Sequence, residues 1–395
     1  MSVTTAVVLA AGEGTRLRPL TRNRPKPMLP AATRPILEHV LDELVAAGMR
    51  RLVVVVGYRR ERVQKHFGPE YRDIPIEYVH QRKQLGSGHA LLQARSAVSE
   101  PMVVVNGDHL VEASAVRAVA DSFEQSETNA AVAVIEREDA RRYGAVTLDG
   151  NTLTEIIEKP DRDEYRLINA GIYAFDESIF TAIDETPLDA GELALTATIS
   201  RLRNPVRAVR IDGLWIDATY PWDLLDVMSA VLSRGRIAEH EQQPGIYIAP
   251  DARVHDDATL QPPVAIGADA EIGPGAVVGP TVAVGRNVTI GANATVTRSL
   301  LDADSRVRPA TTLIDTVCGE AVDIGAATTV AGGSADVRVG QQVFENRQLG
   351  AVLADRVTVG GAAVFEPGTL VCPGATIEPG AFVRGRVPED GTVVR

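Results

Sequence analysis

The chain of 395 residues is longer than one hydrophobic core usually organises, so we expect two domains. Its net charge of −12 and aromatic content of 4% argue against a nucleic-acid-binding surface. It contains no apolar run long enough for a membrane span and no basic stretch leading into an apolar one at its start, so we expect neither a membrane nor a secreted protein. Cys318 and Cys372 lie far apart without a metal-binding spacing, which is typical of a reducing cytoplasm.

Residues 1–235 alternate buried apolar runs with amphipathic helical patterns. The predicted strands are Val3–Leu9, Arg51–Val56, Ile74–His80, Met102–Asn106 and Ala130–Ile135. The predicted helices are Pro35–Ala47, Glu61–Phe67, His89–Val98 and Ser114–Gln125. This alternation indicates βαβ units and a Rossmann-like α/β domain with a mostly parallel, mixed sheet. Asp149-Gly150 is typical of a hairpin turn added to that sheet.

After a linker at residues 236–248, a six-residue repeat marks a second domain over residues 249–395. An aliphatic or aromatic residue recurs in phase from Val254 to Val296 and again from Val359 to Val383. Three hexads make one coil of a left-handed parallel β-helix, with these residues pointing inward. A β-sandwich with a chance run of small residues is the alternative. The repeat lapses between about 300 and 350, where we expect loops or distorted coils.

The first strand leads into a glycine-rich basic stretch, LAAGEGTRLRPLTRNRPKPMLP, which runs from Leu9 to Pro30. Leu17 stands where a dinucleotide-binding fingerprint needs glycine, and Thr15-Arg16 follows the second glycine where a P-loop needs lysine. The glycines still let backbone N–H groups approach phosphates, and Arg16 and Lys26 supply positive charge. The structural alternative is a solvated basic loop.

This stretch resembles the N-terminal motif of sugar-1-phosphate nucleotidylyltransferases. Six further motifs continue the resemblance in order along residues 1–235: QLGSGHAL, NGDH, RYGAV, EKP, NAGIY and WID. The resemblance implies attack of a sugar 1-phosphate on the α-phosphorus of UTP or dTTP, with release of pyrophosphate. It implies no protein nucleophile, so catalysis would consist of positioning and charge neutralisation.

The resemblance also implies a role for individual residues. The nucleotide-binding positions match Leu9, Gly12, Gly14, Gln81 and Gly86. The phosphate-binding cations match Arg16, Lys26 and Lys159, of which Lys159 would meet the sugar phosphate. The sugar-binding positions match Gly144, Glu158 and Asn169. The Mg²⁺ ligands match Asp108 and Asp217, although Thr219 stands where the family has a glycine, which puts the metal geometry in doubt.

Some of these assignments compete with a simpler structural role. Gln81 would otherwise be a surface polar residue, and Asp108 would be the N-cap of the following helix. Asp108, however, follows a strand at the carboxyl edge of the predicted sheet, where ligands bind in α/β folds. Lys65 and Lys83 match no motif and are expected on the surface.

In the second domain, the segment CGEAVDIGAATTVAGG resembles part of bifunctional enzymes that also acetylate glucosamine 1-phosphate. Their catalytic His, Tyr and Asn positions fall here near Pro309, Thr312 and Gly332, and no histidine follows His255. A general base for acetyl transfer is therefore missing. We expect a structural domain whose flat coil faces assemble a homotrimer with closed three-fold symmetry.

These motifs and departures are compatible with three functions. The leading one is an enzyme that makes a UDP- or dTDP-sugar from glucose 1-phosphate or N-acetylglucosamine 1-phosphate. The second adds acetyl transfer through some other base, and the third is a catalytically silent regulatory subunit. The intact phosphate and metal motifs argue against the third. Because every matched residue precedes Arg234, a chain ending there is expected to keep some transferase activity.

Overall fold

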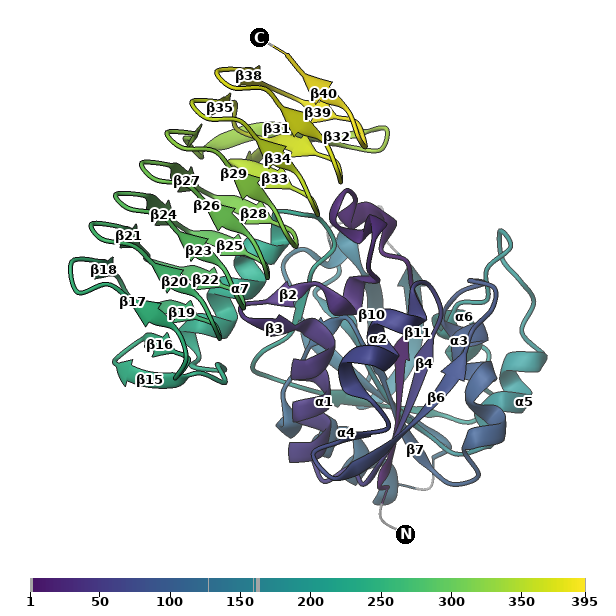
Figure 1. Ribbon diagram of the computed structural model, residues 1–395. Helices are drawn as coiled ribbons and strands as arrows, with labels where there is room; N and C mark the ends of the chain where they lie inside the picture. Colours follow the sequence, from purple (N-terminus) through teal and green to yellow (C-terminus); the bar gives the residue numbers. More distant parts are fainter. Residues whose placement is uncertain (1–2, 127, 159, 161–163, 395) are drawn as a thin grey trace. The chain divides into compact units, whose positions relative to one another are not determined.

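The computed structural model describes residues 3–126, 128–158, 160 and 164–394, which form two compact units (Figure 1). The first unit comprises Met1–Glu13, Pro25–Met28 and Ile36–Ile216. The second comprises Gly14–Arg24, Leu29–Pro35 and Asp217–Arg395. The glycine-rich basic stretch is thus shared between the units. The bounds expected from the sequence, two domains at 1–235 and 249–395 with a linker at 236–248, stay a prediction.

A ten-stranded sheet forms the centre of the first unit, in the order β10-β11-β13-β9-β12-β7-β1-β4-β6-β5. Four neighbouring strands run parallel: β7 (Met102–Asn106), β1 (Thr5–Ala10), β4 (Arg51–Val56) and β6 (Ile74–His80). Strand β5 (Glu70–Tyr71) closes this edge in antiparallel pairing with β6. The predicted strands are therefore confirmed in this part of the sheet, and β1 begins and ends slightly later than expected.

The other half of the sheet is more antiparallel than the alternation predicts. Strand β12 (Leu167–Phe175) runs antiparallel to both β7 and β9 (Ala130–Glu136). Strands β10 (Gly144–Asp149) and β11 (Thr152–Glu158) form the hairpin predicted at Asp149-Gly150, where Gly150 has a φ of 59°. Strand β13 (Val206–Arg210) pairs parallel with β9 and antiparallel with β11.

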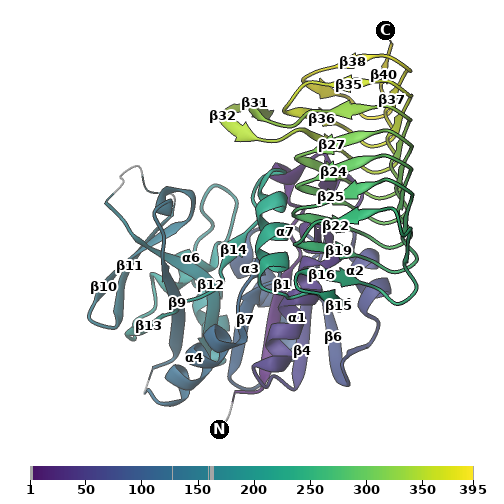
Figure 2. The same cartoon turned by 90° about the vertical axis from the view of Figure 1, so that its left-hand side faces the viewer.

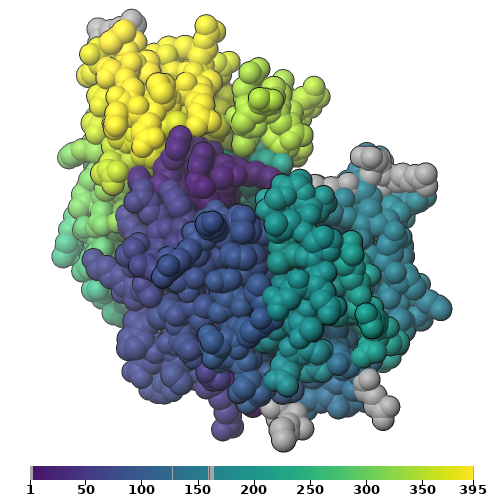
Figure 3. All heavy atoms as spheres, turned by 90° about the vertical axis from the view of Figure 1, so that its right-hand side faces the viewer, coloured from purple at the N-terminus to yellow at the C-terminus, as the bar shows by residue number. Residues whose placement is uncertain are grey.

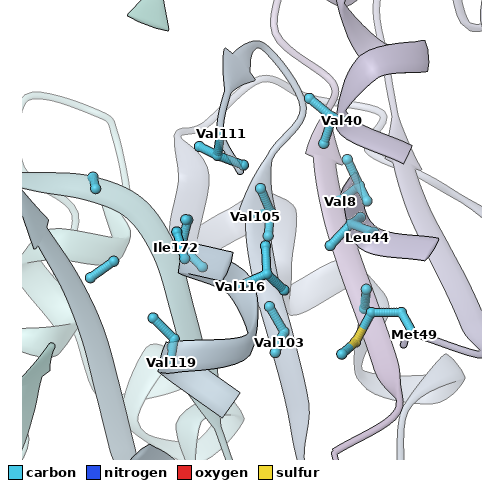
Figure 4. Close-up of a cluster of buried hydrophobic side chains, with 14 of the residues drawn as sticks. Val8, Val40, Leu44, Met49, Val103, Val105, Val111, Val116, Val119 and Ile172 are labelled. Carbon is cyan, nitrogen blue, oxygen red and sulfur yellow. The ribbon is translucent and has the colours of Figure 1, made fainter. Parts of the chain in front are cut away.

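Helices cover both faces of this sheet because successive side chains of each strand point to opposite sides. On one face, Val8 of β1 and Val105 of β7 pack with Leu44 and Val116 (Figure 4). The helices on this face are α1 (Ile36–Ala46), α2 (Arg60–Phe67) and α4 (Ala113–Glu124). Those on the other face are α3 (Ser87–Gln93), α5 (Ser178–Asp184) and α6 (Leu195–Ile199). No helix among the described residues is long and apolar enough to cross a membrane.

Helix positions follow the prediction with two local corrections. The segment predicted as one helix at His89–Val98 begins at Ser87 and changes to a 3₁₀ turn at Ala94–Ala97. Pro35 does not open α1. It lies in strand β3 (Arg34–Pro35), which pairs antiparallel with β2 (Pro30–Ala31) in the second unit.

The second unit contains three parallel sheets that the chain visits in turn, an arrangement consistent with a β-helix (Figure 2). The first sheet contains β16 (Ile246–Ile248), β19 (Val264–Ile266), β22 (Val282–Val284), β25 (Ser299–Leu301), β28 (Thr316–Cys318), β33 (Ala351–Leu353), β36 (Thr369–Val371) and β39 (Arg386–Val387), with β15 (His240–Gln243) antiparallel at its edge. We call residues 246–393 the coil stack.

The two other sheets of the coil stack are built in the same way. One contains β17 (Arg253–Val254), β20 (Glu271–Ile272), β23 (Thr289–Ile290), β26 (Arg306–Val307), β29 (Asp323–Ile324), β34 (Thr358–Val359), β37 (Thr376–Ile377) and β40 (Thr392–Val393). The other contains β18 (Thr259–Leu260), β21 (Val277–Val278), β24 (Thr295–Thr297), β27 (Thr312–Ile314), β30 (Thr329–Val330), β35 (Val364–Phe365) and β38 (Phe382–Val383). The helix α7 (Asp223–Ser233) precedes the stack in the chain.

The coils continue through residues 300–350, where the hexad repeat lapses. Val264 pairs with Val282, three hexads later, but Val282 pairs with Ser299, one residue short of three hexads. This shortening moves the inward positions out of phase while the ladder stays intact. A hairpin of β31 (Ser334–Val339) and β32 (Gln342–Gln348) is then inserted and projects from the stack (Figure 2). The stretch predicted as loops or distorted coils therefore consists of shortened coils and this inserted hairpin.

Candidate active site

Three strand ends meet at the carboxyl edge of the parallel strands in the first unit. Ala10 of β1 pairs with Val56 of β4, which in turn pairs with His80 of β6. Gly57 follows β4, and a Cβ atom there would lie 2.8 Å from the Ala11 carbonyl oxygen and 3.2 Å from that of Gln81. Gly57 thus lets the segments after β1 and β6 approach each other. Gly57 is not among the predicted site residues, although a glycine directly after a run of valines indicates a close approach of this kind.

Gln81 is buried rather than on the surface, with 4% of the residue exposed. Its amide nitrogen donates a hydrogen bond to the Gly86 carbonyl oxygen at 3.2 Å and lies 2.9 Å from Nδ1 of His89. The structure therefore brings Gln81 and Gly86 together, as the sequence analysis expects. A buried amide held in place by such bonds is suited to reading the edge of a nucleobase.

Gly86 occupies a backbone conformation that favours glycine, with a φ of 96°. A Cβ atom at this position would lie 2.6 Å from the Leu193 carbonyl oxygen. Leu193 belongs to the stretch GELALT, and its backbone exchanges hydrogen bonds with Leu85 and Gly88 at 2.6 and 2.8 Å. The close approach of these two loops explains why the Gly86 position has no room for a side chain.

Lys26 and Asp108 form an ion pair within the first unit. The Lys26 ammonium lies 2.7 Å from Oδ2 of Asp108, and only 9% of Lys26 is exposed. Asp108 is not a helix cap, because Glu112 occupies the N-cap position of α4. His109 Nε2 lies 3.8 Å from the other carboxylate oxygen of Asp108. Asp108 and His109 belong to a group of side chains whose donor atoms could hold a metal ion.

Gly144, Glu158 and Asn169 come together on the other half of the sheet. Gly144 pairs with Glu158 across the β10–β11 hairpin, and a Cβ atom on Gly144 would lie 3.1 Å from the Glu158 carboxylate and 3.9 Å from Asn169. The Asn169 amide donates to the Tyr173 hydroxyl at 2.6 Å and accepts from the Gly171 N–H at 3.1 Å. Burial raises the pKa of Tyr173 to about 12, so its hydroxyl stays neutral while it orients Asn169.

The site also contains residues that our sequence analysis did not select. A Cβ atom on Gly171, whose φ is 73°, would lie 2.5 Å from the Asn106 amide and 2.9 Å from Nδ1 of His109. The edge of His109 meets the Trp215 ring, with 5.3 Å between centroids, and the Trp215 N–H donates to the Ala170 carbonyl oxygen at 2.7 Å. All of these lie in the motifs NGDH, NAGIY and WID, so reading whole motifs rather than single positions would have found them.

Three predicted site residues lie in the second unit. Gly14 has a left-handed backbone, with a φ of 69°, and precedes a 3₁₀ turn at Thr15–Leu17 that carries the exposed Arg16. The Asp217 carboxylate accepts a hydrogen bond from the Thr219 hydroxyl at 2.7 Å. Thr219 has no positive φ, so this position does not require the glycine that the family usually has. The predicted Lys159 lies outside the described residues.

The strand order arranges the first-unit groups in a row. Strand β7, which leads to Asp108, lies between β1 on one side and β12 on the other. Gln81 and Gly86 follow strands on the β1 side, whereas Glu158 and Asn169 belong to strands on the β12 side. A buried amide, a paired cation and carboxylate, and a polar carboxylate–amide pair therefore follow one another along the sheet edge, as a base, a phosphate chain and a sugar would require.

This fold and the order of these groups are compatible with nucleotidyl transfer, and comparisons with known proteins establish the family. The family profile described as nucleotidyl transferase matches residues 5–234, and one described as GMPPB C-terminal domain matches residues 260–381. The chain belongs to the nucleotidyl transferase family and is a sugar-1-phosphate nucleotidyltransferase.

Known relatives are similar over different lengths of the chain. UTP–glucose-1-phosphate uridylyltransferase AglF of Haloferax volcanii is 41% identical over 225 residues, which cover 55% of this chain and 92% of AglF. A bifunctional sugar-1-phosphate nucleotidylyltransferase/acetyltransferase of Sulfurisphaera tokodaii is 30% identical over 398 residues, covering 96% of both chains. The solved UDP-glucose pyrophosphorylase of Acinetobacter baumannii shares the fold, with a TM-score of 0.54, 23% identity, and coverage of 59% of this chain and 94% of its own.

The Gly86 position has no room for a side chain, so a substitution there should disturb the loop. We expect Gly86→Ala to lower the free energy of unfolding and to weaken binding of a nucleoside triphosphate, because the new methyl group meets the Leu193 carbonyl oxygen. Gly48→Ala is the matched control, since Gly48 has a φ of 95° but no atom within 4 Å of its Cβ position. Chemical denaturation should show Gly86→Ala to be less stable than Gly48→Ala by about 1–3 kcal/mol. Equal losses in the two variants would show that the Leu193 contact is unimportant.

Proposed function

We propose that this enzyme transfers a uridylyl or thymidylyl group from UTP or dTTP to glucose 1-phosphate or N-acetylglucosamine 1-phosphate and releases pyrophosphate. The observation that carries the proposal is the row of groups along the sheet edge, in which Asp108, paired with Lys26, follows strand β7 between the Gln81 side and the Glu158 side. The uridylyltransferase name of the Haloferax volcanii relative supports UTP and glucose 1-phosphate in particular.

In this proposal, the Gln81 amide pairs with the edge of a uracil or thymine, and Gly12, Gly14 and Gly86 let the nucleotide approach the backbone. Gln81 is already held by the Gly86 carbonyl oxygen, so the side chain loses little freedom on binding. The Glu158 carboxylate accepts hydrogen bonds from sugar hydroxyls, the Asn169 amide donates to them, and Tyr173 fixes the amide of Asn169. These contacts hold the sugar phosphate in line with the α-phosphorus.

The reaction needs charge neutralisation rather than a protein nucleophile. A phosphate oxygen of the sugar 1-phosphate forms the new P–O bond at the α-phosphorus while the bond to pyrophosphate breaks. Arg16 and Lys26 would stabilise the negative charge on the triphosphate, and Lys159 would bind the sugar phosphate. Because Lys26 is nearly buried, its charge is poorly screened by solvent and acts strongly on a bound phosphate.

The chemistry of the acidic side chains fits Mg²⁺. Asp108 and Asp217 would be its protein ligands, since Mg²⁺ prefers oxygen donors and usually binds one or two carboxylates together with substrate phosphates. Thr219 orients one carboxylate oxygen of Asp217 through its 2.7 Å hydrogen bond. When bound, Mg²⁺ would neutralise and orient the triphosphate.

For the coil stack we propose a left-handed β-helix that is structural and assembles a cytoplasmic homotrimer, without acetyltransferase activity. Segment 318–333 contributes strands β28, β29 and β30 to the stack, and no histidine follows His255 to act as a base. The two cysteines of the chain, Cys318 and Cys372, are buried free thiols, which suits a reducing compartment.

Removing the metal ligand tests the transferase mechanism. We expect Asp108→Asn to lower Mg²⁺-dependent pyrophosphate release by at least about 10²-fold, because the amide is a poor substitute for a carboxylate ligand. The control is Asp121→Asn, which changes an exposed residue of α4 in the same way. Near-normal activity of Asp108→Asn would show that the metal assignment is wrong.

Acetyl transfer is tested with acetyl-CoA and glucosamine 1-phosphate. We expect no release of free CoA thiol above the level without sugar phosphate, because the coil stack lacks a histidine base. The same preparation must release pyrophosphate from UTP or dTTP, which shows that it is folded and active. Substrate-dependent thiol release would contradict the structural role of the stack.

The assembly is tested by light scattering on the full-length protein. Flat coil faces that expose parallel strands favour closed three-fold packing, so we expect a mass of about three chains. The measured mass should stay constant over a tenfold dilution. A monomer at all concentrations would contradict the trimer.

A further inference from the structure

Arg24 lies at the end of the Gly14–Arg24 segment and is buried among acids of the coil stack. Only 7% of Arg24 is exposed. One guanidinium nitrogen contacts the Asp302 carboxylate, and the other lies 2.6 Å from Asp355 Oδ1 and 3.5 Å from Glu320 Oε2. All four residues belong to the second unit. We call them the Arg24 cluster.

The acids of the cluster occupy one corner of three consecutive coils. Strands β25, β28 and β33 are neighbours in one sheet, and Asp302, Glu320 and Asp355 lie one or two residues beyond their ends. Gly319 leaves room for this arrangement, because a Cβ atom there would lie 2.5 Å from Oδ1 of Asp355. The same oxygen accepts a hydrogen bond from the Glu320 N–H at 3.0 Å. The corner is therefore built to present carboxylates to one cation.

The cluster differs from an ordinary surface ion pair in its burial. The side chains of Arg24 and Asp355 are 8% and 3% exposed, so both charges are removed from water. Burial tends to lower the pKa of Arg24, but Asp302, Asp355 and Glu320 outweigh it and raise that pKa. Burial raises the pKa of Asp302, and Arg24 opposes this. Loss of Arg24 would leave buried carboxylates without their cation, which is costly.

The Gly14–Arg24 segment is compact, and it contains Arg16. The Thr21 hydroxyl donates to the Gly14 carbonyl oxygen at 2.8 Å, and the Leu17 N–H donates to the same oxygen at 3.0 Å. Within the second unit, Arg22 Nε lies 3.7 Å from Glu389 Oε2, which belongs to the yellow C-terminal part of the surface in Figure 3. Fixing Arg24 therefore fixes the whole segment on the coil stack.

Arg16 faces the coil stack across a positively charged concavity. A pocket of about 400 Å³ is lined by arginines of the segment and by residues of the stack: Thr15, Arg16, Arg18, Arg22, Val339, Gly340 and Arg386. The stack thus holds the segment and also adds charge next to Arg16. Two residues beyond Arg24, the chain reaches Lys26.

A second contact holds the other site segment of this unit. Tyr220 and Trp222, which closely follow Asp217, stack with 4.9 Å between ring centroids. Phe344 of the β31–β32 hairpin packs on both rings at 4.4 and 5.2 Å. Arg347 of the same hairpin lies 5.7 Å from the centre of the Trp222 ring. The coil stack therefore supports both Arg16 and Asp217.

We propose that Arg24 is a positioning residue for nucleotidyl transfer: its buried ion pairs with Asp302 and Asp355 hold the Gly14–Arg24 segment so that Arg16 meets the triphosphate. The proposal rests on the proposed function, since it assigns Arg16 to the triphosphate. It makes the coil stack part of the machinery that binds the nucleotide. A displacement of about 1 Å in such a group can lower the rate on the order of 10²-fold.

The test compares Arg24→Met with Arg308→Met in the full-length protein. Arg308 forms an exposed pair with Asp323 at 3.0 Å in the same coil stack, so its variant controls for the loss of an Arg–Asp pair. Hydrogen exchange of residues 14–24 and the kcat/KM for each substrate are measured for both variants. Arg24→Lys, which keeps the charge, should recover part of any loss.

We expect Arg24→Met to speed exchange in residues 14–24 and to lower kcat/KM for the nucleoside triphosphate by about 10²-fold. The KM for the sugar 1-phosphate should change little, because Gly144, Glu158 and Asn169 belong to the first unit. Arg308→Met should resemble the unchanged protein in both measurements. Unchanged exchange, or faster exchange with normal kcat/KM, would overturn the proposal.

Two precautions keep the result interpretable. If Arg24→Met does not fold, the triple variant Arg24→Met, Asp302→Asn, Asp355→Asn removes the uncompensated charges and is measured in its place. If the unchanged protein releases no pyrophosphate with any nucleotide and sugar phosphate pair, the proposed function fails. Even then, the positioning role can be tested by hydrogen exchange. If residues 14–24 exchange as slowly in Arg24→Met, or in the triple variant, as in the unchanged protein, the positioning role is overturned.

Discussion

Parallel pairing of β7, β1, β4 and β6 is the constraint on which the candidate active site of the first unit depends. Parallel strands all end at the same edge, so residues far apart in the chain, such as Gln81 and Asp108, reach that edge together. Antiparallel β12 then brings Asn169 to the other side of the row, next to the Gly144–Glu158 pair. The small residues Gly57, Gly86 and Gly171 allow the loops beyond the strands to approach closely.

The two units use buried charge in different ways. Lys26 and Asp108 form a pair of one cation and one carboxylate in the candidate site, where a phosphate chain and a metal are proposed to take over their interactions. Arg24 instead contacts three carboxylates that no substrate is proposed to reach, so its charge serves to hold the chain in place. Buried ion pairs are weak sources of stability, and a role in fixing geometry explains both better.

Sequence reasoning predicts most of this structure where a periodic pattern or a complete motif exists. Strands β4, β6 and β7 have the expected bounds, and the motifs containing Gln81 and Asp108 bring those residues to one edge. It does not predict the coils around Ser299, because a coil that is one residue short destroys the hexad phase without breaking the ladder. It also does not predict the Arg24 cluster, since Arg24 lies 278 residues from Asp302 and 331 residues from Asp355 in the chain and only the fold brings them together.

The shared glycine-rich stretch has a consequence for how such enzymes can diversify. A chimera joined near residue 235 would combine residues 14–24 of one parent with the coil corner of another, where acids matching Asp302 and Asp355 need not exist. The chain segments on the two sides of residue 235 are therefore not independent of each other, because residues 14–24 belong to the same unit as the coil stack. Under the proposed role of Arg24, such a chimera keeps its full activity only when residues 14–24 and the acids of the coil corner come from the same parent.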